Sequence, residues 1–116
     1  MVLPGFPNFF MMCGPNAGVR ARSFHSAVEM LSRYICSAIT QMIERGASST
    51  ELKEEVYIDY NQRLDEGMTE LLWEEEKGGN SYYLNRHGKS GVNMPWRMHE
   101  FYDFIYAADP DHYLHR

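Results

Sequence analysis

The segment that most constrains the fold is Gly5-Phe6-Pro7-Asn8-Phe9-Phe10-Met11-Met12-Cys13-Gly14-Pro15-Asn16. Its centre, residues 9–13, is a continuous apolar run bounded by turn-forming residues. Such a run predicts a short strand that is buried on both faces, as in a parallel sheet. We find no second run of this kind and no βαβ pattern in the rest of the sequence. The strand is therefore expected to lack the neighbours that a parallel sheet requires.

The residues after this run predict a tight loop that leads into a helix. Two glycines and a proline within residues 14–18 favour a turn. Ser26 with Glu29 fits a capping box at the start of the helix, Ser23 is an alternative N-cap, and Gly46 is placed to end it. A helix N-terminus behind a glycine-rich turn favours a negative or electron-rich group, although a plain strand-to-helix connection has the same pattern. The helix itself is indicated by apolar residues at three- and four-residue steps: Phe24, Ala27, Val28, Leu31, Ile35, Ala38, Ile39 and Met42.

The rest of the chain predicts a second long helix and an aromatic C-terminal segment. Ser48 and Glu51 form a candidate capping box for a helix over residues 49–75, and Asp59 and Arg63 are spaced to pair on its surface. Residues 81–85 and 92–94 suggest a short hairpin, residues 96–106 a closing helix, and the residues after Asp109 a frayed tail. The second helix is marked by a stripe at four-residue spacing: Leu52, Val56, Tyr60, Leu64, Met68 and Leu72.

The composition bounds the fold class and the partners. At 116 residues the chain is long enough for one small domain, and its net charge of -5 argues against nucleic acid as a partner. No long apolar run predicts a membrane span, and Cys13 and Cys36 are expected to be buried, reduced thiols in a cytoplasmic protein. We expect no metal site, because His112 and His115 lie in a polar tail. The predicted class is a mostly helical α+β fragment.

The motifs of this chain resemble those of one enzyme family. The stretch from Gly5 to Asn16 is similar to the G-F-P-N-hydrophobic-G-P-N segment of Baeyer–Villiger and related flavin monooxygenases. Further matches keep the family order through nearly the whole chain: Glu29, Arg33-Tyr34-Ile35, Tyr60-Asn61, Trp73, Ser81-Tyr82-Tyr83, Gly88 and Pro95-Trp96. The resemblance implies that residues 1–116 are the C-terminal part of an FAD-binding domain. Residues 1–24 would supply a strand and a flavin-facing loop, residues 25–76 two helices, and residues 77–116 the aromatic segment.

The resemblance also implies a chemistry. In that family FAD reacts with NADPH and O2, and the resulting flavin peroxide inserts one oxygen beside a ketone or oxidises a heteroatom such as a sulfide sulfur. The two G-x-G-x-x-G dinucleotide fingerprints are absent here, so an NADPH site and most of the FAD site are expected on a missing upstream portion or a complementary chain. The isolated chain is expected to be inactive, with no catalytic residue of its own. The residues that the resemblance places against FAD are Gly14, Pro15, Asn16, Ser23 and Phe24.

A second interpretation belongs to a different functional class. The chain is then a small helical protein-interaction module that uses its apolar run and aromatic tail to bind a partner and has no cofactor. An in-frame dinucleotide fingerprint in the DNA just upstream would favour the monooxygenase fragment over this module.

Overall fold

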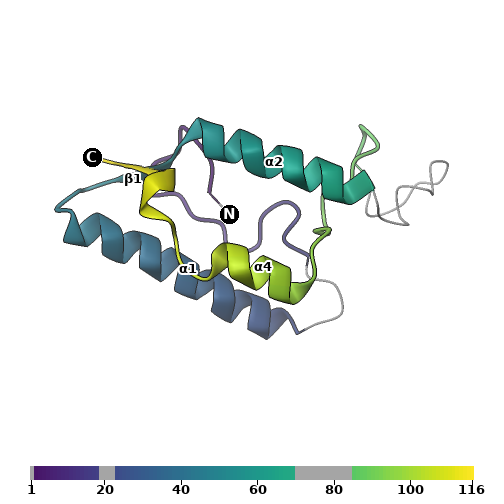
Figure 1. Cartoon of the computed structure of the whole chain (residues 1–116), viewed down its shortest axis with the longest axis horizontal. Helices are drawn as coiled ribbons and strands as arrows, with labels where there is room; N and C mark the ends of the chain where they lie inside the picture. Colours follow the sequence, from purple (N-terminus) through teal and green to yellow (C-terminus); the bar gives the residue numbers. More distant parts are fainter. Residues whose placement is uncertain (1, 19–22, 70–84) are drawn as a thin grey trace.

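Three helices and one small antiparallel sheet make up the part of the chain that can be described. The computed structural model describes residues 2–18, 23–69 and 85–116. Helices α1 (Phe24–Glu44) and α4 (Met98–Ile105) pack side by side, and α2 (Glu54–Thr69) lies on the other side of the N-terminal segment (Figure 1). Strand β1 (Thr50–Leu52) precedes α2, and the 3-10 turn η1 (Pro110–His112) leads into β2 (Tyr113–His115).

Helix α1 forms where its apolar periodicity predicts, and both of its ends carry recognisable caps. Ser23 has extended backbone angles, and its hydroxyl oxygen accepts a hydrogen bond from the His25 N–H. At the other end Gly46 has a φ of +67°, the left-handed conformation that glycine adopts most easily. The Gly46 N–H donates to the Ile43 carbonyl and the Ala47 N–H to the Met42 carbonyl, which completes a Schellman motif. The alternative cap Ser23 and the stop Gly46 are confirmed, whereas the predicted capping box of Ser26 and Glu29 is wrong, because both residues lie inside the helix.

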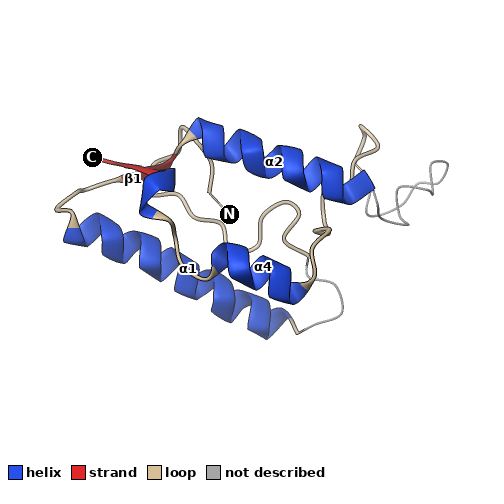
Figure 2. Ribbon diagram, in the orientation of Figure 1, coloured by secondary structure: helices blue, strands red, loops and turns tan. Residues whose placement is uncertain are grey.

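The predicted strand at residues 9–13 is wrong. These residues have no strand conformation (Figure 2), and Phe9 and Met12 are 46% and 36% exposed. The segment is instead held to β1 by Asn8, whose backbone N–H donates to the Thr50 carbonyl and whose side-chain oxygen accepts from the Thr50 N–H, both at 2.9 Å. A continuous apolar run becomes a doubly buried strand only when other strands flank it. Among the described residues none does.

The C-terminal residues correct a second prediction. Residues 113–115 were expected to fray, but they pair with residues 50–52 in the register Thr50 with His115, Glu51 with Leu114 and Leu52 with Tyr113. Glu51 is therefore a strand residue rather than the second half of a capping box. Helix α2 begins at Glu54 instead of residue 49, because the strand occupies the intervening positions.

Other local predictions have mixed outcomes. The Asp59–Arg63 pair is present on α2, with an N–O distance of 3.8 Å, and the closing helix is α4. Cys13 and Cys36 are exposed, so the prediction of buried thiols is wrong. The end of the second predicted helix, Trp73, and residues 81–84 of the predicted hairpin lie outside the described residues. Within the described ranges, every helix falls short of the length and apolarity that crossing a membrane demands.

One core joins the two ends of the chain. Met94 is fully buried beside α1 and α4, and the Tyr34 and Tyr113 hydroxyls meet at 2.6 Å. Two polar side chains of α1 fix the chain that follows α4, because Gln41 donates to the Ala108 carbonyl and the Ser37 hydroxyl accepts from the Ala108 N–H. The buried cluster comprises Leu31, Tyr34, Ala38, Leu52, Met94, Phe101, Ile105, Ala108 and Tyr113.

Candidate functional site

The loop predicted to face a cofactor is clamped to a segment far along the chain. The Asn16 side-chain amide donates to the carbonyls of Ser90 and Asn93, at 2.8 and 2.9 Å. The Asn16 backbone N–H donates to the Gly91 carbonyl at 2.9 Å. Gly18 continues this pairing in a parallel bridge with Asn93. Residues 14–18 are thus held in one conformation by residues 90–94.

Two residues of this loop have backbone geometries that restrict their replacement. Asn16 has a φ of +54°, a left-handed conformation that asparagine tolerates better than most residues. A Cβ atom on Gly18 would lie 2.6 Å from the Val92 carbonyl oxygen, so only glycine permits this close approach. The contacts between residues 14–18 and residues 90–94, which we call the Asn16 clamp, therefore explain why asparagine and glycine occupy these two positions.

The start of α1 presents backbone donors next to an aromatic ring. Ser23 caps the His25 N–H, whereas the N–H groups of Phe24 and Ser26 have no acceptor among the described residues. No acidic side chain lies in the first turn, so nothing there offsets the positive end of the helix dipole. The Phe24 ring is 65% exposed. This combination suits an electron-rich planar group, with donors at its edge and an aromatic ring beside it.

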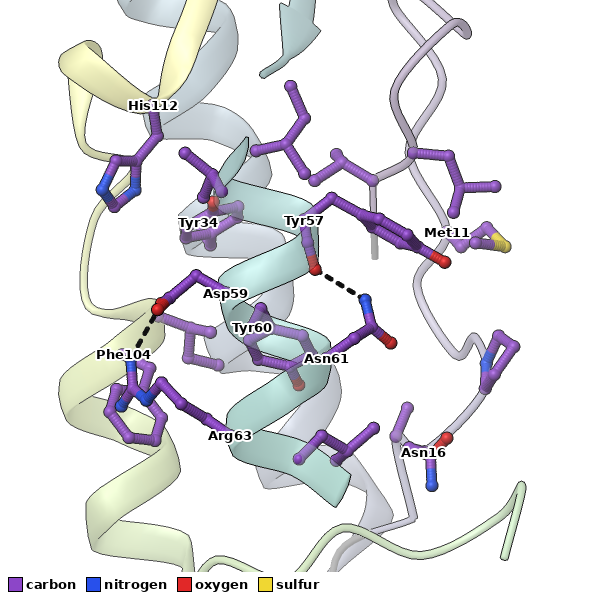
Figure 3. Close-up of a pocket in the computed structure, with 18 of the residues that line it drawn as sticks. Met11, Asn16, Tyr34, Tyr57, Asp59, Tyr60, Asn61, Arg63, Phe104 and His112 are labelled. Carbon is purple, nitrogen blue, oxygen red and sulfur yellow. Dashed lines mark hydrogen bonds and ion pairs between the residues drawn. The ribbon is translucent and has the colours of Figure 1, made fainter. Parts of the chain in front are cut away.

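The predicted site residues fall into two groups in space. Pro15 and Asn16 line a pocket of about 510 Å³ between the N-terminal segment and the three helices (Figure 3). Gly14 precedes them, and its carbonyl accepts from the Ala17 N–H in a tight turn. Ser23 and Phe24 stand at the start of α1, outside the residues that line the pocket. The two groups are separated in sequence by residues 19–22, which lie outside the described part.

Sequence reasoning missed the segment that holds the loop. Ser90 is 9% exposed and Met94 is fully buried, yet both come from a stretch that was predicted only as a turn and a short strand. The one local signal was the turn chemistry of Gly91 and Asn93. The pairing itself spans 74 to 77 residues of sequence, which local patterns do not encode.

Comparison with known proteins relates this chain to one group of enzymes. It is 33% identical over 113 residues to an uncharacterized monooxygenase of Sinorhizobium fredii, a match that covers 97% of this chain and 17% of that protein. It is 35% identical over 89 residues to a Baeyer-Villiger monooxygenase of Pseudomonas aeruginosa, covering 77% of this chain and 16% of the relative. An FAD-binding monooxygenase of Aspergillus terreus is 25% identical over 82 residues, covering 71% and 14%.

The chain thus spans less than a fifth of the length of these curated relatives. No family model matches the sequence. No solved structure is significantly similar to it.

Proposed function

This chain is a relative of monooxygenases, Baeyer-Villiger and FAD-binding ones among them, and from that kinship we propose that it is the C-terminal part of an FAD- and NADPH-dependent monooxygenase. The observation that carries the proposal is the similarity across 97% of the chain to a protein named a monooxygenase. The proposed reaction inserts one atom of O2 beside a ketone carbonyl or adds it to a heteroatom. The second oxygen atom leaves as water, with the two electrons supplied by NADPH.

The residues at the start of α1 fit one edge of a flavin. The N–H groups of Phe24 and Ser26, which have no acceptor among residues 2–18, 23–69 and 85–116, are hydrogen-bond donors, and the helix dipole adds positive potential where reduced flavin carries negative charge. Ser23 holds the first turn in place, and Phe24 offers an exposed aromatic face. When bound, FAD would supply the electron transfer and the activation of oxygen, which no protein side chain provides.

The loop of Gly14, Pro15 and Asn16 would supply the second part of the same site. Its backbone is fixed by the bonds from Asn16 to the carbonyls of Ser90 and Asn93. Because the loop is already fixed before a ligand arrives, binding does not have to order it. The entropy cost of binding is therefore smaller, which favours affinity. Asn16 is therefore proposed as a positioning residue. Ser23 and Phe24 are proposed to touch the cofactor.

A chimera tests the proposal. The matching segment of the Pseudomonas aeruginosa Baeyer-Villiger monooxygenase is replaced by this chain, and the purified protein is assayed for bound flavin and for ketone-dependent NADPH consumption. We expect flavin to be retained and activity to be measurable. A matched variant, Phe24→Asp, places a negative charge at the start of α1 and is expected to lower flavin content, whereas Ile58→Asp, on an exposed position of α2 outside the pocket lining, is not.

The outcome that overturns the proposal is a soluble, folded chimera that carries no flavin. The isolated chain is expected to consume no NADPH, and stoichiometric flavin with substrate-dependent turnover in the chain alone would contradict the proposed division of the site.

The alternative is a helical protein-interaction module without a cofactor. It is favoured by the exposed aromatic side chains of the N-terminal segment, since Phe6 and Phe9 are 59% and 46% exposed. Reading the DNA upstream of the coding sequence separates the two proposals. An in-frame G-x-G-x-x-G fingerprint supports the monooxygenase, and its absence supports the module.

A further inference from the structure

We propose that the pocket between α2 and the α1–α4 pair is a binding site for one small, uncharged and largely apolar organic molecule. The pocket has a volume of about 510 Å³, within the range of sites that take small organic ligands. Its walls come from α1, α2, α4 and the N-terminal segment. Neither Ser23 nor Phe24 lines this pocket, whereas Pro15 and Asn16 of the loop proposed to face the cofactor do, so the pocket adjoins that loop.

Contacts near both ends of α2 fix its position relative to the rest of the chain. At the N-terminal end, β1 ties α2 to the C-terminal strand. Towards the other end, Gly67 lies so close to Pro95 that an added Cβ would be 2.8 Å from the proline ring. Between these fixed points Val56 and Tyr60 line the pocket, and Tyr60 is among the lining residues labelled in Figure 3. The apolar stripe predicted for this helix is thus buried at Leu64 and Met68, while Tyr60 stays 37% exposed.

One side of the pocket is closed by aromatic contacts. Tyr60 packs on Trp96 with ring centroids 5.3 Å apart, and Trp96 packs edge-on against Phe104 at 5.2 Å. The Arg63 guanidinium lies over the Phe104 ring at 4.7 Å and pairs with Asp59. The positive charge of Arg63 is therefore already paired with the Asp59 carboxylate at the edge of the pocket.

The residues that line the pocket indicate which kind of ligand it can bind. Most side chains facing the space are aliphatic or aromatic, including Leu31, Leu52 and Phe101. The hydroxyls of Tyr57 and Tyr60 have no hydrogen-bond partner among the described residues, so they can serve a carbonyl or hydroxyl group of a ligand. Glu55 and Asp59 also line the pocket; Asp59 pairs with Arg63, and the remaining negative charge of Glu55 disfavours an anion.

Nile red, a neutral dye that fluoresces in apolar surroundings, is the probe for the test. We expect the full chain, without flavin, to bind one dye molecule saturably. Val56→Trp fills the pocket and is expected to weaken binding at least tenfold. Ile58→Trp makes the same kind of change on an exposed position of α2 outside the lining, and it is expected to leave binding within twofold.

Folding is checked by circular dichroism before each titration. If Val56→Trp loses the helical signal of the unmodified chain, Val56→Phe, which adds less volume, replaces it with the same expectation of weaker binding. The proposal is overturned if the folded chain binds no dye, if both tryptophan variants bind as the unmodified chain does, or if both lose binding equally. Tighter binding of the anionic dye anilinonaphthalene sulfonate would overturn the preference for an uncharged ligand. Because no arm uses flavin or NADPH, the result stands apart from the proposed monooxygenase function.

Discussion

The hydroxyl oxygens of Tyr34 and Tyr113 lie 2.6 Å apart in the core, although 79 residues separate them in the sequence. Tyr34 belongs to α1 and Tyr113 to the last strand, and both are less than a tenth exposed. Each hydroxyl is the partner of the other, so neither is left unsatisfied by its burial. The contact joins the first helix of the chain to the C-terminal strand.

Removing one hydroxyl of this pair is expected to cost more than removing both. Tyr113→Phe leaves the Tyr34 hydroxyl buried without a partner, so we expect a loss of about 1–3 kcal/mol in the free energy of unfolding. Tyr34→Phe is expected to behave in the same way. The double variant is expected to lose less than the sum of the two, as measured by urea denaturation of all four proteins. Strictly additive losses would show that the two hydroxyls are not coupled.

Burial also raises the pKa values of three tyrosine hydroxyls. It raises the pKa of Tyr60 to about 12 and raises the pKa values of Tyr34 and Tyr113 above their usual range. The folded chain then holds more protons than the unfolded chain above pH 10. Stability is therefore fully present below pH 10 and falls as pH rises toward 12. Phenolate absorbance should show these three of the eight tyrosines ionising late. Ionisation of Tyr34, Tyr60 and Tyr113 near pH 10, with the helical signal intact, would contradict this.

Asn16 is expected to stabilise the fold through both its backbone and its side chain. Asn16→Gly keeps the left-handed backbone but removes the bonds to Ser90 and Asn93, at an expected cost of about 1–3 kcal/mol. Asn16→Ala adds the strain of a positive φ, about 1–2 kcal/mol more. Denaturant melts of the two variants give the difference. Equal stability of the glycine and alanine variants would mean that the loop does not hold this conformation in solution.

Gly67 provides a case in which helix propensity and packing oppose each other. Alanine at this position gains about 1 kcal/mol of helix propensity, but its Cβ would lie 2.8 Å from the Pro95 ring. Overpacking of this kind costs about 1–3 kcal/mol, so we expect Gly67→Ala to be neutral or destabilising. Gly91→Ala, outside the helices, where a Cβ meets nothing within 4 Å, shows the effect of losing a glycine with neither a clash nor a gain in helix propensity. A gain of the full propensity value in Gly67→Ala would show that α2 does not approach Pro95 this closely.

The sequence was sufficient for features set by neighbouring residues. The caps Ser23 and Gly46 and the periodicity between them specify α1, because a helix is stabilised by contacts three and four residues apart. The Asp59–Arg63 pair follows from the same spacing. The family resemblance, too, depended on short ordered motifs and was confirmed by the relatives.

Features set by distant residues were predicted poorly. The tail from Tyr113 onward carries no strong strand signal, and its structure comes from pairing with β1 and from burial against Tyr34. Glu51 fits a capping box by spacing alone, but this pairing places it in a strand. For the candidate site, Gly14, Pro15 and Asn16 were recognised as a loop, whereas their attachment to residues 90–94 was not. The strand predicted at residues 9–13 is the opposite case. Its apolar composition suggested a strand, but no neighbouring strand pairs with it among the described residues.

The order in which the chain leaves the ribosome gives the Asn16 clamp a further meaning. Asn16 emerges before its acceptors at Ser90 and Asn93, which are made 74 and 77 residues later, and β2, the partner of β1, follows them. Helix α1 can therefore form during translation before the loop that precedes it, because that loop must wait until residues 90–93 have been made. A premature stop codon that removed only residues 113–116 would delete β2 and the Tyr113 side chain, and with them the contacts that join β1 and α1 to this strand.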